Sequence, residues 1–251
     1  MLDFCRKRFR CIFAFTLAEV LITLGVIGVV AAMTLPILVQ TYRNHVVETR
    51  LKKFYSIINQ AIQRAEVDYG DRKDWYEDLQ GATLDKNGNR VDGSSASERW
   101  FKKYFEPYLS VVKYSYSSTE RGFYVYFPDG SVLANGGANT RTWTYYPVNP
   151  ERCIEMDFDD KVGVCAFSFN YFPVIATTNG ISGNASDYQK WKYVLNKGFE
   201  PYTFNWNGTK QGLYNGCKGN VVSGTAHAYC TKIIQDNGWK IPKDYPRKIR
   251  F

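Results

Sequence analysis

The sequence predicts an α+β protein in which one long N-terminal helix packs on an antiparallel β-sheet domain. Residues 20–39 form a continuous uncharged apolar run. Residues 47–65 then carry apolar side chains at a helical spacing. After residue 110, several segments alternate between apolar and polar residues in the manner of strands. Together these observations favour a helix with a membrane half and an amphipathic half, followed by a sheet.

The apolar run has the length of a membrane span. Its twenty residues, at a rise of about 1.5 Å each, make a helix of roughly 30 Å, the thickness of a bilayer's hydrocarbon core. Four basic residues precede it: Arg6, Lys7, Arg8 and Arg10. Four more follow it: Arg43, Arg50, Lys52 and Lys53. The tight leading cluster favours a cytoplasmic N-terminus, and the second group weakens that orientation without reversing it.

Glu19 near the start of the run leaves three interpretations open. A cleaved secretory signal could end at the small residues Val30–Ala32, but the apolar run continues beyond them. A plain membrane anchor would hold an unpaired carboxylate, which costs of order 2–3 kcal/mol at mid-membrane and less near the edge. In the third interpretation the carboxylate has a partner on another chain.

The third interpretation comes from a resemblance. The stretch "FAFTLAEVLITLGVIGVVAAMTLPIL" resembles the prepilin N-terminal cleavage and methylation signature of type IV pilins and type II secretion pseudopilins. The close resemblance covers residues 6–65, and the ending "CTKIIQDNGWKIPKDYP" resembles that of a group of prepilin-like proteins. The signature residues are Ala14, Phe15, Thr16, Leu17 and Glu19, followed by Gly25, Gly28 and Pro36. Ala14 is a departure, because the family usually has glycine there.

The resemblance assigns roles to these residues. A prepilin peptidase would cut between Ala14 and Phe15, release the leader 1–14 and methylate the Phe15 amine. Residues 15–39 would remain as the transmembrane and polymerisation half of the helix. The Glu19 carboxylate would pair with the N-terminal amine of a neighbouring subunit, since a buried charge needs a partner. Three further residues would soften the helix: Gly25, Gly28 and Pro36.

The resemblance also implies a function and a location. The chain would be a structural subunit of a type IV pilus or a type II secretion pseudopilus, not an enzyme. It would be a single-pass protein of the bacterial inner membrane, with a cytoplasmic N-terminus and a periplasmic C-terminal domain. Other pilin or pseudopilin subunits and an inner-membrane assembly platform would be its partners, and it would end in a surface or periplasmic filament.

Two alternatives stay open. One is a minor, tip-located pilin with an adhesin or DNA-binding role, and the other is a membrane-anchored secreted enzyme. The formal net charge of +8 falls to +5 without the leader. Part of it lies in the ending "KDYPRKIRF", for which a solvated basic tail is the favoured interpretation and nucleic-acid binding a minor one.

The amphipathic half is expected over residues 40–69. Six residues form its apolar stripe: Val47, Leu51, Phe54, Ile58, Ala61 and Ala65. Glu48 and Lys52 are spaced for an ion pair one turn apart. Gly70 is a suitable stop, so one helix is expected from Phe15 to Tyr69.

The exported domain, residues 70–251, is expected to hold strands and short helices. Strands are predicted at Val111–Ser117 and in a hairpin at Gly122–Ala134 that turns at Asp129-Gly130. The runs 141–148 and 153–172 are also strand-like, the latter with a turn at Asp159–Gly163. Short helices are predicted at Ser97–Leu109, capped by Ser97, at 186–198 and at 225–238.

The six cysteines divide between the two sides of the membrane. Cys5 and Cys11 belong to the leader. Four lie in the exported part, where an oxidising compartment favours disulfides: Cys153, Cys165, Cys217 and Cys230. Three pairings are possible, and Cys153–Cys165 across a hairpin with Cys217–Cys230 is favoured, each worth roughly 3 kcal/mol. By the resemblance, the second bridge would pin the C-terminal edge.

Metal and cofactor signals are weak. Four residues approach the spacing of a calcium loop: Asp85, Asn87, Asn89 and Asp92. Arg90 and Ala96 replace the glycine and glutamate that such a loop requires. Asp157–Asp160 is a second acidic cluster, and polar turns are the favoured interpretation of both. Zinc is disfavoured by the cysteine spacings. No cofactor is expected, and calcium stays a minor hypothesis.

Overall fold

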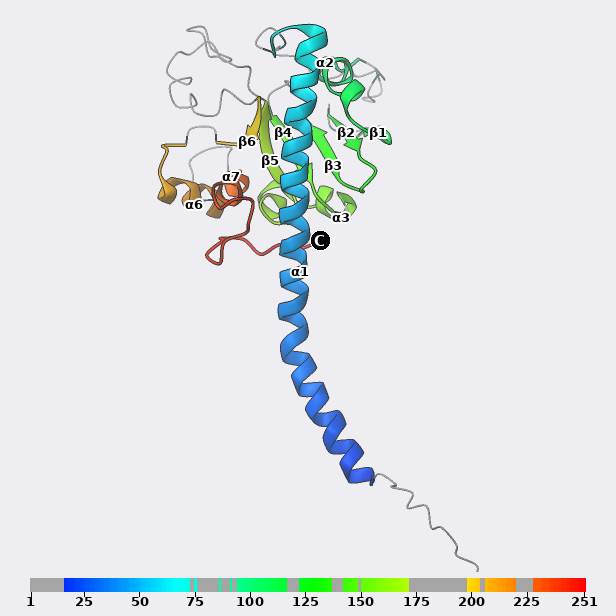
Figure 1. Cartoon of the computed structure of the whole chain (residues 1–251), viewed down its shortest axis with the longest axis vertical. Helices are drawn as coiled ribbons and strands as arrows, with labels where there is room; N and C mark the ends of the chain where they lie inside the picture. The colour runs from blue at the N-terminus through cyan, green and yellow to red at the C-terminus, as the bar shows by residue number, and fades with distance from the viewer. Residues whose placement is uncertain are drawn as a thin grey trace, which may run out of the picture. The chain divides into compact units, whose positions relative to one another are not determined.

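The computed structural model of the 251-residue chain (Figure 1) describes residues 16–72, 75, 86, 91, 94–116, 122–136, 142–148, 150–171, 198–203, 206–219 and 228–251. The chain divides into two compact units, Met1–Tyr42 and Arg43–Phe251. The first unit holds the apolar part of one helix. The second holds the rest of that helix, a sheet and several short helices, so the predicted α+β class is confirmed.

The helix α1 runs without interruption from Leu17 to Tyr69 and contains Pro36. All six residues of the predicted apolar stripe are buried, and Ile62 joins them. Gly70 ends the helix as expected. Its φ of 78° is a left-handed conformation that suits glycine, and its N–H donates to the carbonyl of Glu66 at 3.1 Å.

The second unit is built on a six-stranded antiparallel sheet whose strands are paired in chain order. The strands are β1 (Lys113–Tyr116), β2 (Phe123–Tyr126), β3 (Val132–Asn135), β4 (Thr142–Tyr146), β5 (Phe167–Tyr171) and β6 (Phe199–Pro201). The predicted hairpin is present as β2 and β3, and Gly130 supplies the left-handed residue of its turn, with φ of 79°. Figure 1 shows α1 lying across one face of this sheet.

The main core lies between α1 and that face. The strands contribute Phe123, Val125, Leu133, Trp143, Tyr145, Phe167, Phe169, Tyr171 and Phe199. Phe54 of α1 stacks on Tyr145 with ring centroids 4.0 Å apart. The helix α2 (Ala96–Tyr104) adds the buried Trp100 and Phe101 and leads into a 3₁₀ turn, η2 (Glu106–Tyr108). The aromatic content of the chain therefore fills one layer between helix and sheet.

Two local predictions were wrong. The N-cap of α2 is Ser95 rather than Ser97, and the Ser95 hydroxyl accepts from the Glu98 N–H at 3.3 Å. The segment predicted as strands before β5 instead forms two short helices, α3 (Pro150–Ile154) and α4 (Phe158–Lys161). Pro150 occupies the first position of α3, and Asp159 and Asp160 lie in the first turn of α4. Both features favour helix.

Two helices complete the described fold. α6 (Lys210–Lys218) and α7 (Cys230–Asp236) pack against each other, and α7 also contacts β5 and β6. α7 falls within the helix predicted at 225–238, whereas α6 and β6 were not predicted. The helix predicted at 186–198 lies almost wholly outside the described residues.

Candidate assembly helix and interaction surfaces

Among the described residues of its own unit, nothing covers the apolar half of α1. Every large apolar side chain between Leu17 and Val39 is at least 41% exposed: Leu17, Val20, Leu21, Ile22, Leu24, Val26, Ile27, Val29, Val30, Met33, Leu35, Ile37, Leu38 and Val39. By length and composition this helix could cross a membrane. A surface of this kind is unstable in water and requires lipid or other apolar helices around it. It is compatible with a single-pass membrane anchor.

Glu19 has a partner within its own chain. Its Oε2 accepts from the backbone N–H and from the hydroxyl of Thr16, both at 2.8 Å. The Thr16 hydroxyl in turn accepts from the Glu19 N–H at 3.2 Å. This reciprocal pair is a capping box, which satisfies N–H groups that the first helical turn leaves unpaired. Ala14 and Phe15, the residues of the expected cleavage and methylation, lie outside the described residues.

The three residues expected to soften α1 all lie in its exposed half. A Cβ atom added at Gly25 or Gly28 would meet nothing within 4 Å. No contact with a described residue of the unit therefore requires glycine at either position. Pro36 lies inside the helix, where it removes one backbone hydrogen bond.

The buried half of α1 is fixed to the sheet edge by a polar seam. The Asn59 side chain pairs with both backbone groups of Phe199 in β6: its Nδ2 donates to the carbonyl at 3.0 Å, and its Oδ1 accepts from the N–H at 3.1 Å. The buried Glu200 carboxylate accepts from the Tyr55 hydroxyl at 2.8 Å and from the Gln235 amide at 2.9 Å. Burial, and then the Glu200 charge, raise the pKa of Tyr55. The amide side chain of Asn59 on the helix thus satisfies the backbone hydrogen-bonding groups of Phe199 in an edge strand.

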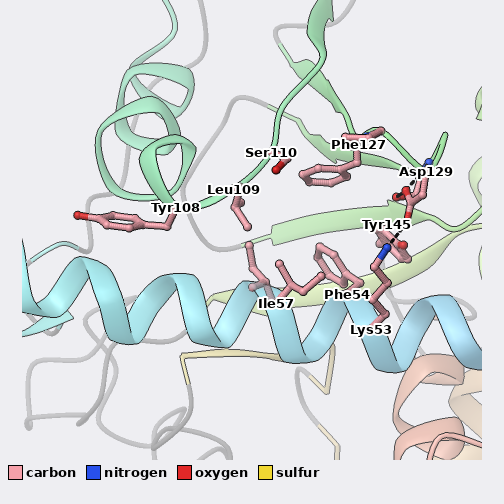
Figure 2. Close-up of a pocket in the computed structure, with 12 residues that line it drawn as sticks. Lys53, Phe54, Ile57, Tyr108, Leu109, Ser110, Phe127, Asp129 and Tyr145 are labelled. Atoms are coloured by element: carbon pink, nitrogen blue, oxygen red, sulfur yellow. Dashed lines mark hydrogen bonds and ion pairs between the residues drawn. The ribbon is translucent and has the colours of Figure 1, made fainter.

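An apolar pocket of about 450 Å³ opens between α1 and the end of the sheet (Figure 2). Ile57 of α1, Leu109 and Phe127 line it, and Ile57 is 40% exposed. An ion pair between Lys53 and Asp129, 3.1 Å apart, lies at one side. Burial alone would raise the pKa of Asp129, but the Ser131 hydroxyl and N–H and the Lys53 ammonium outweigh it and lower that pKa.

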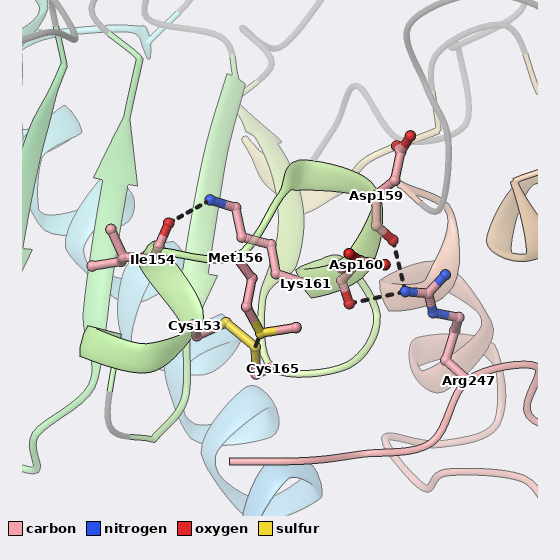
Figure 3. Close-up of a disulfide and its surroundings, with 8 residues drawn as sticks. All are labelled: Cys153, Ile154, Met156, Asp159, Asp160, Lys161, Cys165 and Arg247. Atoms are coloured by element: carbon pink, nitrogen blue, oxygen red, sulfur yellow. Dashed lines mark hydrogen bonds between the residues drawn. A yellow bond between two sulfur atoms is a disulfide. The ribbon is translucent and has the colours of Figure 1, made fainter.

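The first disulfide joins Cys153 to Cys165, one of the two pairs favoured by the sequence. It links α3 to the turn before β5 rather than two strands of a hairpin, because Cys153 lies in α3 and the chain continues into α4. Figure 3 shows Met156 beside this disulfide and Lys161 donating to the Ile154 carbonyl at 3.1 Å. Residues 150–166 therefore cover part of the outer sheet face, which is the face opposite α1.

A groove of about 530 Å³ lies beside this cover on the outer face. The outward side chains of Tyr124 and Tyr146 line it on the sheet side. Met156 and Phe158, which are 37% and 46% exposed, line it on the helical side. The groove combines aromatic rings with hydroxyls and with the charged Asp157.

The second disulfide, Cys217–Cys230, joins α6 to α7 and is the other favoured pair. The Cys230 side chain packs on Gly163, in the turn that the first disulfide closes. The Gly163 carbonyl accepts from the Tyr245 hydroxyl at 2.8 Å. Both disulfide loops and the C-terminal segment therefore meet at one glycine.

The C-terminal segment, residues 238–251, is packed and is not a free solvated tail. The Lys240 ammonium lies 3.1 Å from a Glu48 carboxylate oxygen, and the Ile241 N–H donates to the other oxygen at 2.8 Å. Glu48 thus pairs with Lys240, and the pair expected with Lys52 is not formed. Ile249 is buried, and Arg247 donates to the carbonyls of Asp159 and Asp160 (Figure 3).

Two of these features could not have been predicted from the spacing of residues in the sequence. The seam and the C-terminal contacts join residues from 35 to 193 positions apart, and the residues involved form no motif. Glu19 and Thr16 were different, since Thr-x-x-Glu before an apolar run is itself a capping-box pattern.

Within the described part of the chain, no group of three or more His, Cys, Asp or Glu side chains is placed to hold a metal ion. The expected weak calcium loop at 85–92 lies almost wholly outside that part, which includes none of its four candidate ligands. In the second acidic cluster, the contacts of Asp159 and Asp160 with Arg247 use their backbone carbonyls.

The model of a family of unknown function (DUF6613) matches residues 37–249, so the chain belongs to this family. The match spans nearly all of the second unit and only the end of the apolar run. No curated protein and no solved structure matches the chain.

Proposed function

We propose that this member of the DUF6613 family is a structural subunit of a type IV pilus or a type II secretion pseudopilus. A prepilin peptidase cuts between Ala14 and Phe15, and the new N-terminal amine is methylated. The subunit waits in the bacterial inner membrane as a single-pass protein whose second unit is periplasmic. It then joins other subunits on an assembly platform. The role is structural rather than enzymatic.

The observation that carries this proposal is the bare apolar half of α1 that follows the sequence "AFTLAE". A filament core of packed helices would replace lipid around this surface as the subunit leaves the membrane. Gly25 and Gly28 fit such a core, because glycine without a contact in its own unit leaves room for a neighbouring helix.

Glu19 has two candidate roles that can be separated. In its own chain the carboxylate caps α1 through Thr16. In a filament it would also neutralise the amine of a neighbouring subunit. Glutamine keeps an acceptor oxygen for the cap but carries no charge, so Glu19→Gln removes only the second role. Glu19→Ala removes both, and Thr16→Ala weakens the cap while it leaves the charge.

We expect Glu19→Gln and Glu19→Ala to insert in the membrane normally and to disappear from filaments, whereas Thr16→Ala is incorporated. The measurement is the amount of each variant in the sheared filament fraction, relative to its amount in the membrane fraction of the native host. Normal incorporation of Glu19→Gln would assign Glu19 to helix capping alone and would contradict the charge-pairing role.

The groove on the outer sheet face supports a second candidate, a minor subunit with a binding role. Its aromatic rings, hydroxyls and charged rim at about 530 Å³ offer both stacking and hydrogen bonding to a small ligand. Incorporation at one or a few copies per filament, measured by quantitative mass spectrometry, would favour this candidate over a major subunit.

A further inference from the structure

Two short segments together carry more net positive charge than the whole chain has outside the leader, which is +5. Residues 43–53 carry a net charge of +3 and residues 240–251 a net charge of +4, whereas the whole chain carries +8. The two segments are about 190 residues apart in sequence but lie side by side. The contacts of Glu48 with Lys240 and Ile241 join them, and the Arg43 guanidinium lies 5.7 Å from the centre of the Phe251 ring. They form one basic surface.

A notch of about 460 Å³ lies within this basic surface. Lys52, Lys53 and Lys240 line it, together with Trp239 and the Ser56 hydroxyl. Lys53 and Lys240 each have a carboxylate partner, Asp129 and Glu48 respectively. The Lys52 side chain is exposed and has no ion pair or hydrogen bond among the described residues.

The C-terminal segment adds further uncompensated charge. Lys243, Lys248 and Arg250 are exposed, and none forms an ion pair with a side chain of the described residues. Trp239 and Ile241 beside them are only partly buried. Long basic side chains next to a partly exposed tryptophan are the composition found where proteins meet lipid headgroups.

The covalent chain keeps this surface close to the end of the apolar run, whatever the angle between the two units. Arg43 follows Val39 by four residues, which span at most about 14 Å even when fully extended. Phe251 is in contact with Arg43. The headgroup region adds some 5–8 Å to each side of the hydrocarbon core, so it lies within reach of the basic side chains.

We propose that this basic surface binds the phosphate-bearing headgroups of anionic phospholipids in the leaflet that the second unit faces. The proposal rests on α1 spanning a membrane and does not depend on assembly into a filament. The short chain to Val39 favours lipid over nucleic acid or an acidic protein, because lipid is the anion that the anchored chain meets first. Bound headgroups would hold the second unit on the membrane before assembly.

For the test, the full chain is first placed in nanodiscs of equimolar phosphatidylglycerol and phosphatidylcholine. It is then transferred to detergent, and native mass spectrometry counts the lipid molecules that each protein retains. The wild type is expected to retain phosphatidylglycerol over phosphatidylcholine by about threefold or more. The variant Lys52→Gln/Lys243→Gln/Lys248→Gln is expected to lose this preference. These three side chains make no hydrogen bond or ion pair in the described structure, so the fold should be unaffected.

The matched control is Arg64→Gln/Lys86→Gln/Lys218→Gln, which removes the same charge from exposed positions outside the basic surface. It should keep the wild-type preference. The same preference for phosphatidylglycerol in all three proteins would overturn the proposal. An equal loss of that preference in both variants would overturn it too. A change in oligomeric state or in binding to a DNA oligonucleotide, with lipid preference intact, would assign the surface to a protein or nucleic-acid partner instead. The Glu19 variants leave these charges untouched, so failure of either proposal can be recognised separately.

Discussion

Glu19 and Glu48 show how the same residue type is fixed by different means. Glu19 lies in a run without other charges, and the structure pairs it locally with Thr16, three residues earlier. Glu48 has a lysine one turn later in the sequence, yet it pairs with Lys240 from the far end of the chain. The sequence contains the first contact as a local pattern. It does not contain the second, because the position of residue 240 depends on the whole fold.

Gly163 is a residue at which close packing in the second unit can be tested. Its φ of 77° is left-handed, and a Cβ atom there would overlap the Cys230 sulfur and approach its Cβ to 2.8 Å. We expect Gly163→Ala to lower the free energy of unfolding by about 3 kcal/mol or more, from the left-handed conformation and the overpacking together. Chemical denaturation followed by circular dichroism measures this.

The control for this prediction is Gly130→Ala. Gly130 has a similar φ of 79°, but nothing lies within 4 Å of the added Cβ. It should cost only the conformational term, about 1–2 kcal/mol. Equal losses for the two variants would show that the contact with Cys230 is unimportant.

At the scale of elements, the sequence predicts most where the pattern is local and strong. The stripe of α1 and the β2–β3 hairpin follow from periodicity and from one turn sequence, and both are present. The segment 153–161 failed because a chance alternation of apolar residues resembled a strand, although Met156 and Phe158 are exposed. α6 was missed because it contains Gly212 and Gly216, which disfavour helix. The Thr209 cap and the disulfide at Cys217 stabilise it.

The docking of α1 on the sheet depends on Asn59 beyond its apolar stripe. Asn59→Ala would leave the N–H and the carbonyl of the buried Phe199 without their side-chain partners. We expect a loss of about 2 kcal/mol in the free energy of unfolding, the usual cost of unsatisfied buried groups. Hydrogen exchange should also become faster at the Phe199 amide.

Gln60→Ala is the neighbouring control. Gln60 is exposed, and its amide donates only to Ser56 on the same helix at 3.0 Å. This variant should change stability by less than about 0.5 kcal/mol. A similarly small effect of both substitutions would mean that the contacts of Asn59 with the edge strand add little stability, because alanine is the better helix former at both positions.

At the scale of the whole molecule, the chain has two different parts. One is a helix whose apolar side chains are exposed, and the other is a unit with a well-packed core. The sequence predicts the bare helix, the sheet and the cysteine pairs, since each leaves a local or compositional trace. It does not predict that the basic C-terminal segment packs against α1. That contact brings two like-charged segments together, and Glu48, Ile249 and the ring of Phe251 help to make it favourable.

The processing of the whole chain can be read from the intact mass and N-terminal sequence of the protein recovered from its native membrane. We expect a chain that starts at methylated Phe15 and is four hydrogen atoms lighter than the reduced form, because both disulfides form. The methyl group would show that a prepilin peptidase accepts Ala14, and the missing hydrogens would show that the second unit reached an oxidising compartment. A chain that starts at Met1 would make the protein an anchored, non-polymerising relative of pilins. A start at Met33 would contradict the pilin proposal, because it would remove Glu19 and most of the apolar half of α1 that carries the proposal.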